Sequence, residues 1–180
     1  MVIDRSQALE RFKAYTSHYD PQNHKIALKI DHSLRTAALS ERIAQSLDLS
    51  AEDVDLAWLC GLLHDIGRFE QIRRWNTFSD AKSTSHAQLS VDVLFEAPSA
   101  GMFDTATVAG SSDVTAASET HGSADTTHET PLIRTYVADN SEDNLIKAVV
   151  GLHGVFRLPE GLDARTKQFC DIIRDADKLD

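Results

Sequence analysis

Apolar residues recur every three or four positions in almost every stretch of this chain that holds enough of them to build a core. That spacing is typical of amphipathic α-helices, and no segment shows the strict apolar–polar alternation of a half-buried strand. Helices are predicted over residues 6–17, 23–47, 50–64, 85–95, 141–153 and from 163 to about 177. The sequence therefore predicts an all-α fold.

Several of the predicted boundaries carry the usual signals of helix ends. Ser50 precedes two acidic residues, as an N-cap does, and Ser85 and Asp163 stand at two further helix starts. Pro21 separates the first two helices, and we expect Gly67 to loosen the end of the third.

The length of 180 residues and a hydrophobic content of 42% suit one ordinary domain with a real core. Residues 97–130 differ, because they are rich in Ser, Thr, Ala, Gly and Asp and poor in large apolar side chains. Such a segment buries too little apolar surface to offset the entropy lost on ordering. We expect a single domain over residues 1–180, with 97–130 as a mobile insertion.

The composition excludes several classes of partner. A formal net charge of -10 disfavours a binder of long nucleic acid, which needs a basic face. Cys60 and Cys170 lie in apolar helical patterns, so we expect two buried thiols and no disulfide framework. No apolar run approaches the roughly 20 residues of a membrane span, and the N-terminus lacks the apolar region of a signal peptide. We expect a cytoplasmic protein without a membrane partner.

The dipeptide His64–Asp65 offers a nitrogen and an oxygen ligand side by side, which suits one divalent cation. His32 precedes it, and acidic residues follow in the segment 174–180. Among the other histidines, His86 and His153 also lie on predicted amphipathic helices or at their ends. The remaining four are interpreted as solvated, because they flank a turn or fall in the insertion: His18, His24, His121 and His128.

These residues resemble the HD-domain superfamily of metal-dependent phosphohydrolases in kind, order and spacing. The likeness covers most of the chain outside the insertion and rests on the segments 32–37 (HSLRTA), 62–71 (LLHDIGRFEQ), 76–80 (NTFSD), 85–87 (SHA), 148–153 (AVVGLH) and 174–180 (RDADKLD). The resemblance implies an all-helical bundle with a metal at its centre.

By the same resemblance, the metal ligands are His32, His64, Asp65 and Asp177. Helical periodicity alone does not choose between Asp175 and Asp177, which flank the apolar stripe of their helix on opposite sides. Asp177 also lies three residues from the last residue of the sequence. We expect either a weakly held last ligand or further helices beyond residue 180.

Some branches of the superfamily hold a second metal, and the resemblance makes His86 and His153 its candidate ligands, with Asp65 bridging. The alternative is that both histidines only contact substrate, water or another ligand. A donor set of nitrogen and oxygen without thiolate disfavours a structural zinc site. It suits Mn, Fe, Co, Ni, Zn or Mg, and the sequence does not choose among them.

The expected activity is hydrolysis of a phosphoester by a metal-activated water. Asp65 is predicted to orient or deprotonate that water. Arg68, one helical turn further on, is a candidate to bind a phosphate, the alternative being a surface residue that satisfies the end of the helix. Arg35 and Lys82 are weaker candidates for the phosphate contact.

The expected substrate is a small nucleotide or another phosphorylated metabolite. Residues 154–161 lack the Gly-Tyr-Pro element that marks the cyclic-dinucleotide branch, so that branch is poorly matched. Two other interpretations remain open. One is a non-catalytic sensor module that binds a nucleotide or a metal, and the other is a structural helical protein with scattered histidines.

Overall fold

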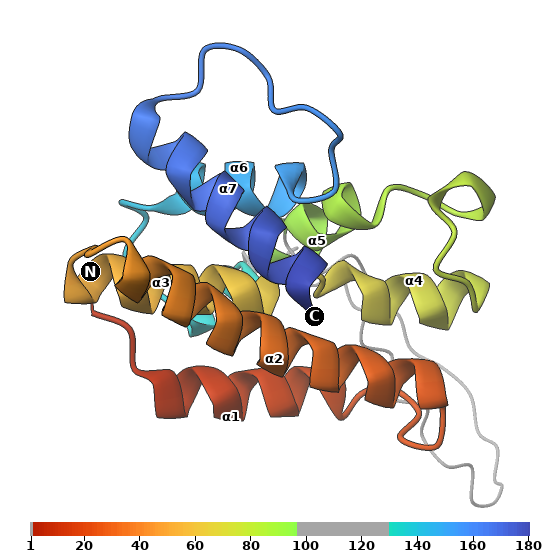
Figure 1. The fold of residues 1–180 in the computed structure, drawn as a ribbon. Helices are drawn as coiled ribbons and strands as arrows, with labels where there is room; N and C mark the ends of the chain where they lie inside the picture. The colour runs from red at the N-terminus through yellow and green to blue at the C-terminus, as the bar shows by residue number, and fades with distance from the viewer. Residues whose placement is uncertain (1, 97–129) are drawn as a thin grey trace, which may run out of the picture.

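The computed structural model describes residues 2–96 and 130–180, and within them the regular secondary structure is helical. The α-helices are α1 (Arg5–Thr16), α2 (His24–Ser46), α3 (Ala51–Leu63), α4 (Gly67–Trp75), α5 (His86–Phe95), α6 (Asp143–Leu152) and α7 (Ala164–Leu179), as Figure 1 shows. Two 3₁₀ turns are also present: η1 (Asp80–Lys82) lies between α4 and α5, and η2 (Leu132–Thr135) precedes α6. The predicted all-α fold is confirmed, whereas the predicted insertion lies almost entirely outside the described residues.

Helix α3 forms the centre of the core. Every residue from Leu56 to Leu63 is buried, which accounts for an apolar run on all sides of the helix. The longest helix, α2, packs along it, and Gly61 lets the two backbones approach closely. A Cβ on Gly61 would lie only 2.9 Å from the Cα of Ala37.

Helix α4 was not predicted, and Gly67 begins this helix rather than loosening the end of α3. The Gly67 N–H donates to the hydroxyl of Ser90 on α5, at 2.8 Å. The apolar pattern is hard to see in the sequence because Glu70 and Gln71 are fully buried beside Phe69 and Ile72. Burial of these polar residues breaks the periodicity on which the prediction relied.

The predicted caps and thiols are confirmed. The side chains of Ser50, Ser85 and Asp163 each accept a backbone hydrogen bond at the start of a helix. Cys60 and Cys170 are buried and free. Among the described residues, no helix is both long and apolar enough to cross a membrane.

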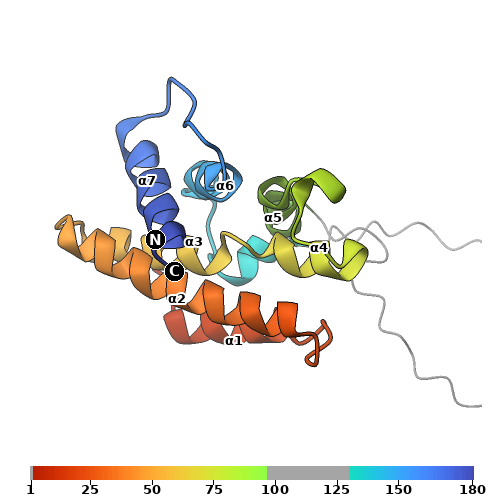
Figure 2. The ribbon, with the colours of Figure 1, turned by 45° about the vertical axis from the view of Figure 1, so that its right-hand side comes forward.

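Helix α7 lies across the α2–α3 pair and also contacts α6. Seen from the side, its C-terminal end comes close to the middle of α2 and to the turn between α3 and α4 (Figure 2). Segments far apart in the sequence thereby meet at one place, where most of the predicted site residues lie.

Candidate metal centre

Two of the predicted site histidines stand at the C-terminal ends of helices. His64 caps α3 and His153 caps α6. Their Nδ1 atoms lie 2.7 Å from the carbonyl oxygens of Gly61 and Val150 respectively. A carbonyl can only accept, so each Nδ1 carries the hydrogen and each neutral ring keeps its lone pair on Nε2.

In the other two histidines, Nδ1 faces a carboxylate oxygen instead of a backbone carbonyl. Nδ1 of His32, in the middle of α2, lies 2.7 Å from Oδ2 of Asp180. Nδ1 of His86, the first residue of α5, lies 2.6 Å from Oδ2 of Asp80. All four rings therefore have Nδ1 engaged with an oxygen and Nε2 directed toward a common centre.

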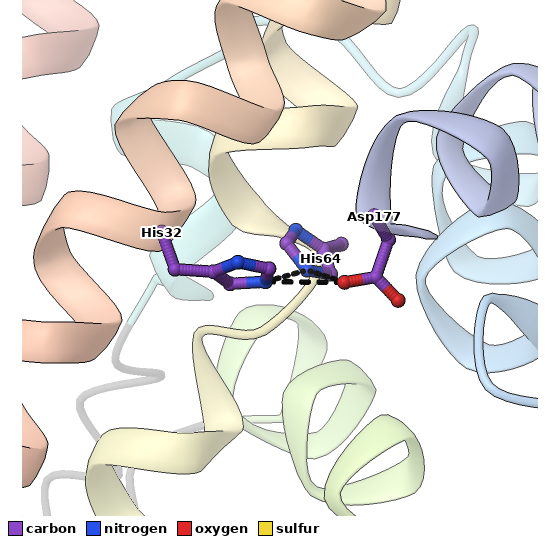
Figure 3. A group of neighbouring side chains, drawn as sticks. All are labelled: His32, His64 and Asp177. Atoms are coloured by element: carbon purple, nitrogen blue, oxygen red, sulfur yellow. Dashed lines mark hydrogen bonds and ion pairs between the residues drawn. The ribbon is translucent and has the colours of Figure 1, made fainter. Parts of the chain in front are cut away.

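The first half of this centre consists of His32, His64 and Asp177, which come from three elements and point toward one another (Figure 3). Nε2 of His32 lies 3.1 Å from Nε2 of His64 and 3.1 Å from Oδ1 of Asp177. Nε2 of His64 lies 3.5 Å from the same Asp177 oxygen. Oδ2 of Asp65 completes the half, 3.6 Å from Nε2 of His32.

The second half consists of His86 and His153, whose Nε2 atoms are 3.0 Å apart. Oδ1 of Asp65 lies 3.4 Å from Nε2 of His153 and 3.7 Å from Nε2 of His86. The two halves are continuous, because ligand atoms of His64, Asp65 and His153 also lie within 4.8 Å of one another.

Asp65 connects the two halves, since each of its carboxylate oxygens faces one of them. The residue is only 3% exposed. Its Oδ1 is buried and accepts no hydrogen bond from the described part of the chain. A buried carboxylate oxygen without a hydrogen-bond donor is normally compensated by a cation or a water.

These distances fit a bound cation. Two ligands about 2.1 Å from one ion stand about 3.0 Å apart at a right angle and about 3.4 Å apart at the tetrahedral angle. The separations in both halves fall between 3.0 and 3.7 Å. Two facing Nε2 lone pairs repel unless a positive charge lies between them, so the donor set also fits a metal chemically.

The electrostatics of the centre favour positive charge. Burial raises the pKa of Asp65, but His64, His153 and Lys29 outweigh it and hold that pKa well below its ordinary value. Burial likewise raises the pKa of Asp177, but its close contacts with the imidazoles of His32 and His64 outweigh burial and lower that pKa. Both carboxylates are therefore ionised at neutral pH.

A comparison with protein-family models matches the HD domain over residues 30–180. The chain belongs to the HD-domain family. The matched segment contains every residue of the centre described above. The HD family consists in general of metal-dependent phosphohydrolases. The histidines and aspartates of this centre form groups that could hold a metal ion. No curated protein and no solved structure matches the chain.

In this HD centre, the acid of α7 that faces the histidines is Asp177. The side chain of Asp175 is 67% exposed and has Lys178 as its neighbour, at 4.0 Å. Asp171 pairs with Lys167 on the outside of α7. The packing of α7 across α2 thus selects one of the two acids that periodicity left open.

The two arginines and the lysine predicted to contact phosphate occupy different places. Nη1 of Arg68 donates to Gln71, to the carbonyl of Phe78 and to Asp80, while its buried Nε lies 3.5 Å from Oδ1 of Asp65. Arg35 is paired with Asp180. Lys82 is exposed on η1. Arg68 is the one that adjoins the HD centre, and there it braces the segment carrying Asp80.

Three residues near the centre had no role in the sequence prediction: Lys29, Asp80 and Asp180. Nζ of Lys29 lies 2.6 Å from Oδ2 of Asp65. Lys29 precedes His32 by three residues, and Asp180 follows Asp177 by three, so each shares a helix face with a predicted ligand. This three-residue spacing from a predicted ligand is the sequence pattern from which Lys29 and Asp180 could have been predicted. Asp80 contacts His86 through a non-helical segment and offers no such signal.

The histidines interpreted as solvated differ from the four of the centre. His18 and His24 are exposed, and Nδ1 of His18 lies 3.2 Å from the carbonyl of Tyr15. His121 and His128 lie outside the described residues.

Proposed function

We propose that this protein is a metal-dependent phosphohydrolase that acts on a small phosphorylated substrate, a nucleotide in the first instance. One observation carries the proposal: four imidazole Nε2 atoms and the carboxylates of Asp65 and Asp177 converge within 3.0–3.7 Å of their neighbours. Such an arrangement is not expected in a purely structural helical protein, because buried acceptors without a hydrogen-bond donor lower the stability of the fold.

The residues of the centre have distinct parts in the proposed reaction. His32, His64, Asp177 and Asp65 would hold a divalent ion, which supplies a polarised phosphoryl oxygen and a water of lowered pKa. If one ion is bound, Oδ1 of Asp65 is the acceptor that orients the attacking water, because it accepts no hydrogen bond from the described protein atoms. Arg68 keeps Asp80, and through it His86, in place.

We further propose that His86 and His153 are ligands of a second ion, with Asp65 bridging. The support is geometric, since Nε2 of His86 and Nε2 of His153 are 3.0 Å apart and both face Oδ1 of Asp65. Ion content per chain, measured after reconstitution with Mn²⁺ and desalting, distinguishes the cases. One ion per chain would assign both histidines to water or substrate instead.

The choice of a small substrate rests on charge. A chain with a net charge of -10 repels a long polyanion, whereas bound cations supply the local positive charge that one small phosphate needs. A panel of nucleoside mono-, di- and triphosphates and cyclic nucleotides, screened for phosphate release or ester cleavage, tests this part of the proposal.

The reaction class is tested with chromogenic phosphomonoester and phosphodiester substrates, with and without Mn²⁺. We expect turnover that chelation abolishes, and we expect His64→Gln to lose both bound metal and activity. His24→Gln is the matched control, because His24 is exposed at the start of α2. Full activity in the His64→Gln protein would overturn the proposal.

A sensor module is the second candidate, and the same assays separate it from an enzyme. A sensor binds Mn²⁺ and a nucleotide tightly, but cleaves neither the chromogenic esters nor any member of the nucleotide panel. The completeness of the ligand set favours the enzyme, since binding alone does not require an acceptor such as Oδ1 of Asp65 to be left for a water.

A further inference from the structure

Lys29 places a cation directly on the carboxylate that connects the two halves of the centre. Its Nζ lies 2.6 Å from Oδ2 of Asp65, the oxygen that also faces His32 and His64. The Lys29 side chain is only 16% exposed. A half-buried ammonium at this distance from a proposed metal ligand affects both the metal and any group that the metal binds.

The position of Lys29 is fixed by its surroundings. It lies on α2 three residues before His32, so its direction depends on the same helix that presents that ligand. The ammonium also lies 5.6 Å from the ring centroid of Phe78, within range of a cation–π contact. Arg68 lies near the same ring, at 5.7 Å. Two cations therefore lie near the Phe78 ring, one beside each oxygen of Asp65.

The ammonium has capacity for another partner. A lysine carries three N–H donors, and within the described residues Asp65 is the hydrogen-bonding partner of Lys29. The remaining donors can meet an oxygen of a phosphoryl group while the contact with Asp65 persists. Arg68, the cation that the sequence favoured for this task, has its Nη1 engaged by Gln71, Phe78 and Asp80, while its buried Nε makes no hydrogen bond within the described residues.

The same charge acts against the metal. An ammonium and a divalent ion that share one carboxylate oxygen repel each other at close range, in surroundings where water screens little. Lys29 therefore weakens the attraction of Asp65 for a metal, even as it stabilises the buried carboxylate.

We propose that Lys29 binds the phosphoryl group of the substrate through its free donors while it stays hydrogen-bonded to Asp65, and that its charge lowers the affinity of the centre for divalent cations. This inference rests on the proposed function, since it requires a metal centre that receives a phosphate. It adds a substrate-binding residue that the sequence prediction did not contain.

The test measures Mn²⁺ and inorganic phosphate binding by calorimetry in Lys29→Gln, Lys29→Met and Lys29→Arg proteins. Glutamine keeps a donor toward Asp65 without the charge. For the Gln and Met variants we expect about tenfold tighter Mn²⁺ binding, and about tenfold weaker phosphate binding at saturating Mn²⁺. Lys29→Arg keeps the charge, so its Mn²⁺ affinity should stay within about threefold of wild type.

Lys25→Gln is the matched control, because Lys25 lies one turn earlier on α2 and its ammonium contacts the exposed Asn76. It should leave both affinities unchanged. Circular dichroism checks that each variant is folded. If the Met variant does not fold, the comparison between the Gln and Arg variants is sufficient.

Three outcomes would overturn the inference or its basis. Unchanged or weaker Mn²⁺ binding by Lys29→Gln contradicts the effect on the metal. Unchanged phosphate binding by that variant contradicts the contact with substrate. Failure of the wild-type protein to bind Mn²⁺ at all contradicts the proposed function itself, and so is distinguishable from failure of the role of Lys29.

Discussion

At the scale of single residues, the centre distinguishes two acids that are two positions apart on α7. Oδ1 of Asp177 lies 3.1 Å from Nε2 of His32, whereas the side chain of Asp175 is 67% exposed. We expect Asp177→Asn to lose Mn²⁺ binding by at least about tenfold, because an amide is a poor substitute for a charged ligand. Asp175→Asn should bind Mn²⁺ as the wild type does. Calorimetric titration of both variants with Mn²⁺ measures the two affinities. Equal losses of affinity would contradict the assignment of Asp177 as the ligand.

Asp180 acts on the metal through His32. Its carboxylate accepts from Nδ1 of His32 and is paired with Arg35, which together lower the pKa of Asp180 to about 2. Acceptors of this kind orient a ligating ring, and their removal typically reduces metal affinity about 10- to 100-fold. We expect a loss in that range for Asp180→Ala, with most of it restored in Asp180→Glu. An unchanged Mn²⁺ affinity in Asp180→Ala would show that His32 is held by its helix alone.

The sequence predicted those candidate site residues whose side-chain type is itself typical of a metal ligand. His64 and Asp65 are adjacent on the chain, and His32, His86 and His153 lie on or at the ends of helices whose apolar spacing is visible in the sequence. The partners of Nδ1 could not be predicted so well. Two of them are backbone carbonyls, at Gly61 and Val150, and any residue type supplies a carbonyl.

At the scale of helices, the centre depends on close packing of α4 against α5. A Cβ on Gly67 would lie 2.4 Å from the backbone nitrogen of Ser90 and 2.7 Å from the carbonyl carbon of Leu89. These are backbone atoms, so the helices must move apart to accept it. We expect Gly67→Ala to lower the free energy of unfolding by about 1–3 kcal/mol.

Urea denaturation, followed by circular dichroism, measures this change. Gly151→Ala on α6 is the control, because a Cβ there would meet only a methyl group of Val91 at 3.4 Å. That variant should be neutral or more stable by up to about 1 kcal/mol, since alanine favours a helix over glycine. A Gly67→Ala protein as stable as Gly151→Ala would show that the α4–α5 contact is not tight.

The helices were predictable to different degrees for a physical reason. Where one face of a helix is apolar, as in α6 and α7, the spacing is visible in the sequence. Where polar residues are buried, as Glu70 and Gln71 are in α4, the spacing is hidden. The arginines that compensate Glu70, Arg73 and Arg74, lie on the same short helix and make it appear polar throughout.

At the scale of the whole molecule, metal binding and stability should depend on pH in opposite ways. Burial lowers the pKa of His32, but Asp177 and Asp180 raise it above its ordinary value, and Asp65 does the same for His153. In the metal-free protein, their contribution to stability is fully present below about pH 6.5 and is lost as the pH rises through the raised pKa. The contribution of Asp65 and Asp177 is present above about pH 4 and is lost at lower pH.

A metal must displace the protons of these histidines, so its affinity rises as the pH passes through their pKa. We therefore expect the increase in Tm on adding Mn²⁺ to be small at pH 6 and larger at pH 8. Thermal denaturation with Mn²⁺ and with chelator, at both values, measures it. A shift of equal size at pH 6 and pH 8 would mean that the histidines are not the groups that bind the metal.

The sequence by itself determined the helical class and the caps at Ser50, Ser85 and Asp163, because each depends on neighbours within one helical turn. It also supplied the candidate ligands by residue type, although these lie far apart along the chain. The tertiary structure decided which acid of α7 faces the centre, that Asp65 presents one oxygen to each half, and that Lys29 meets it. His32 and Asp180 are 148 residues apart in sequence and in contact in space. No local spacing encodes that contact, since it arises only when apolar burial draws α7 across α2 and α3.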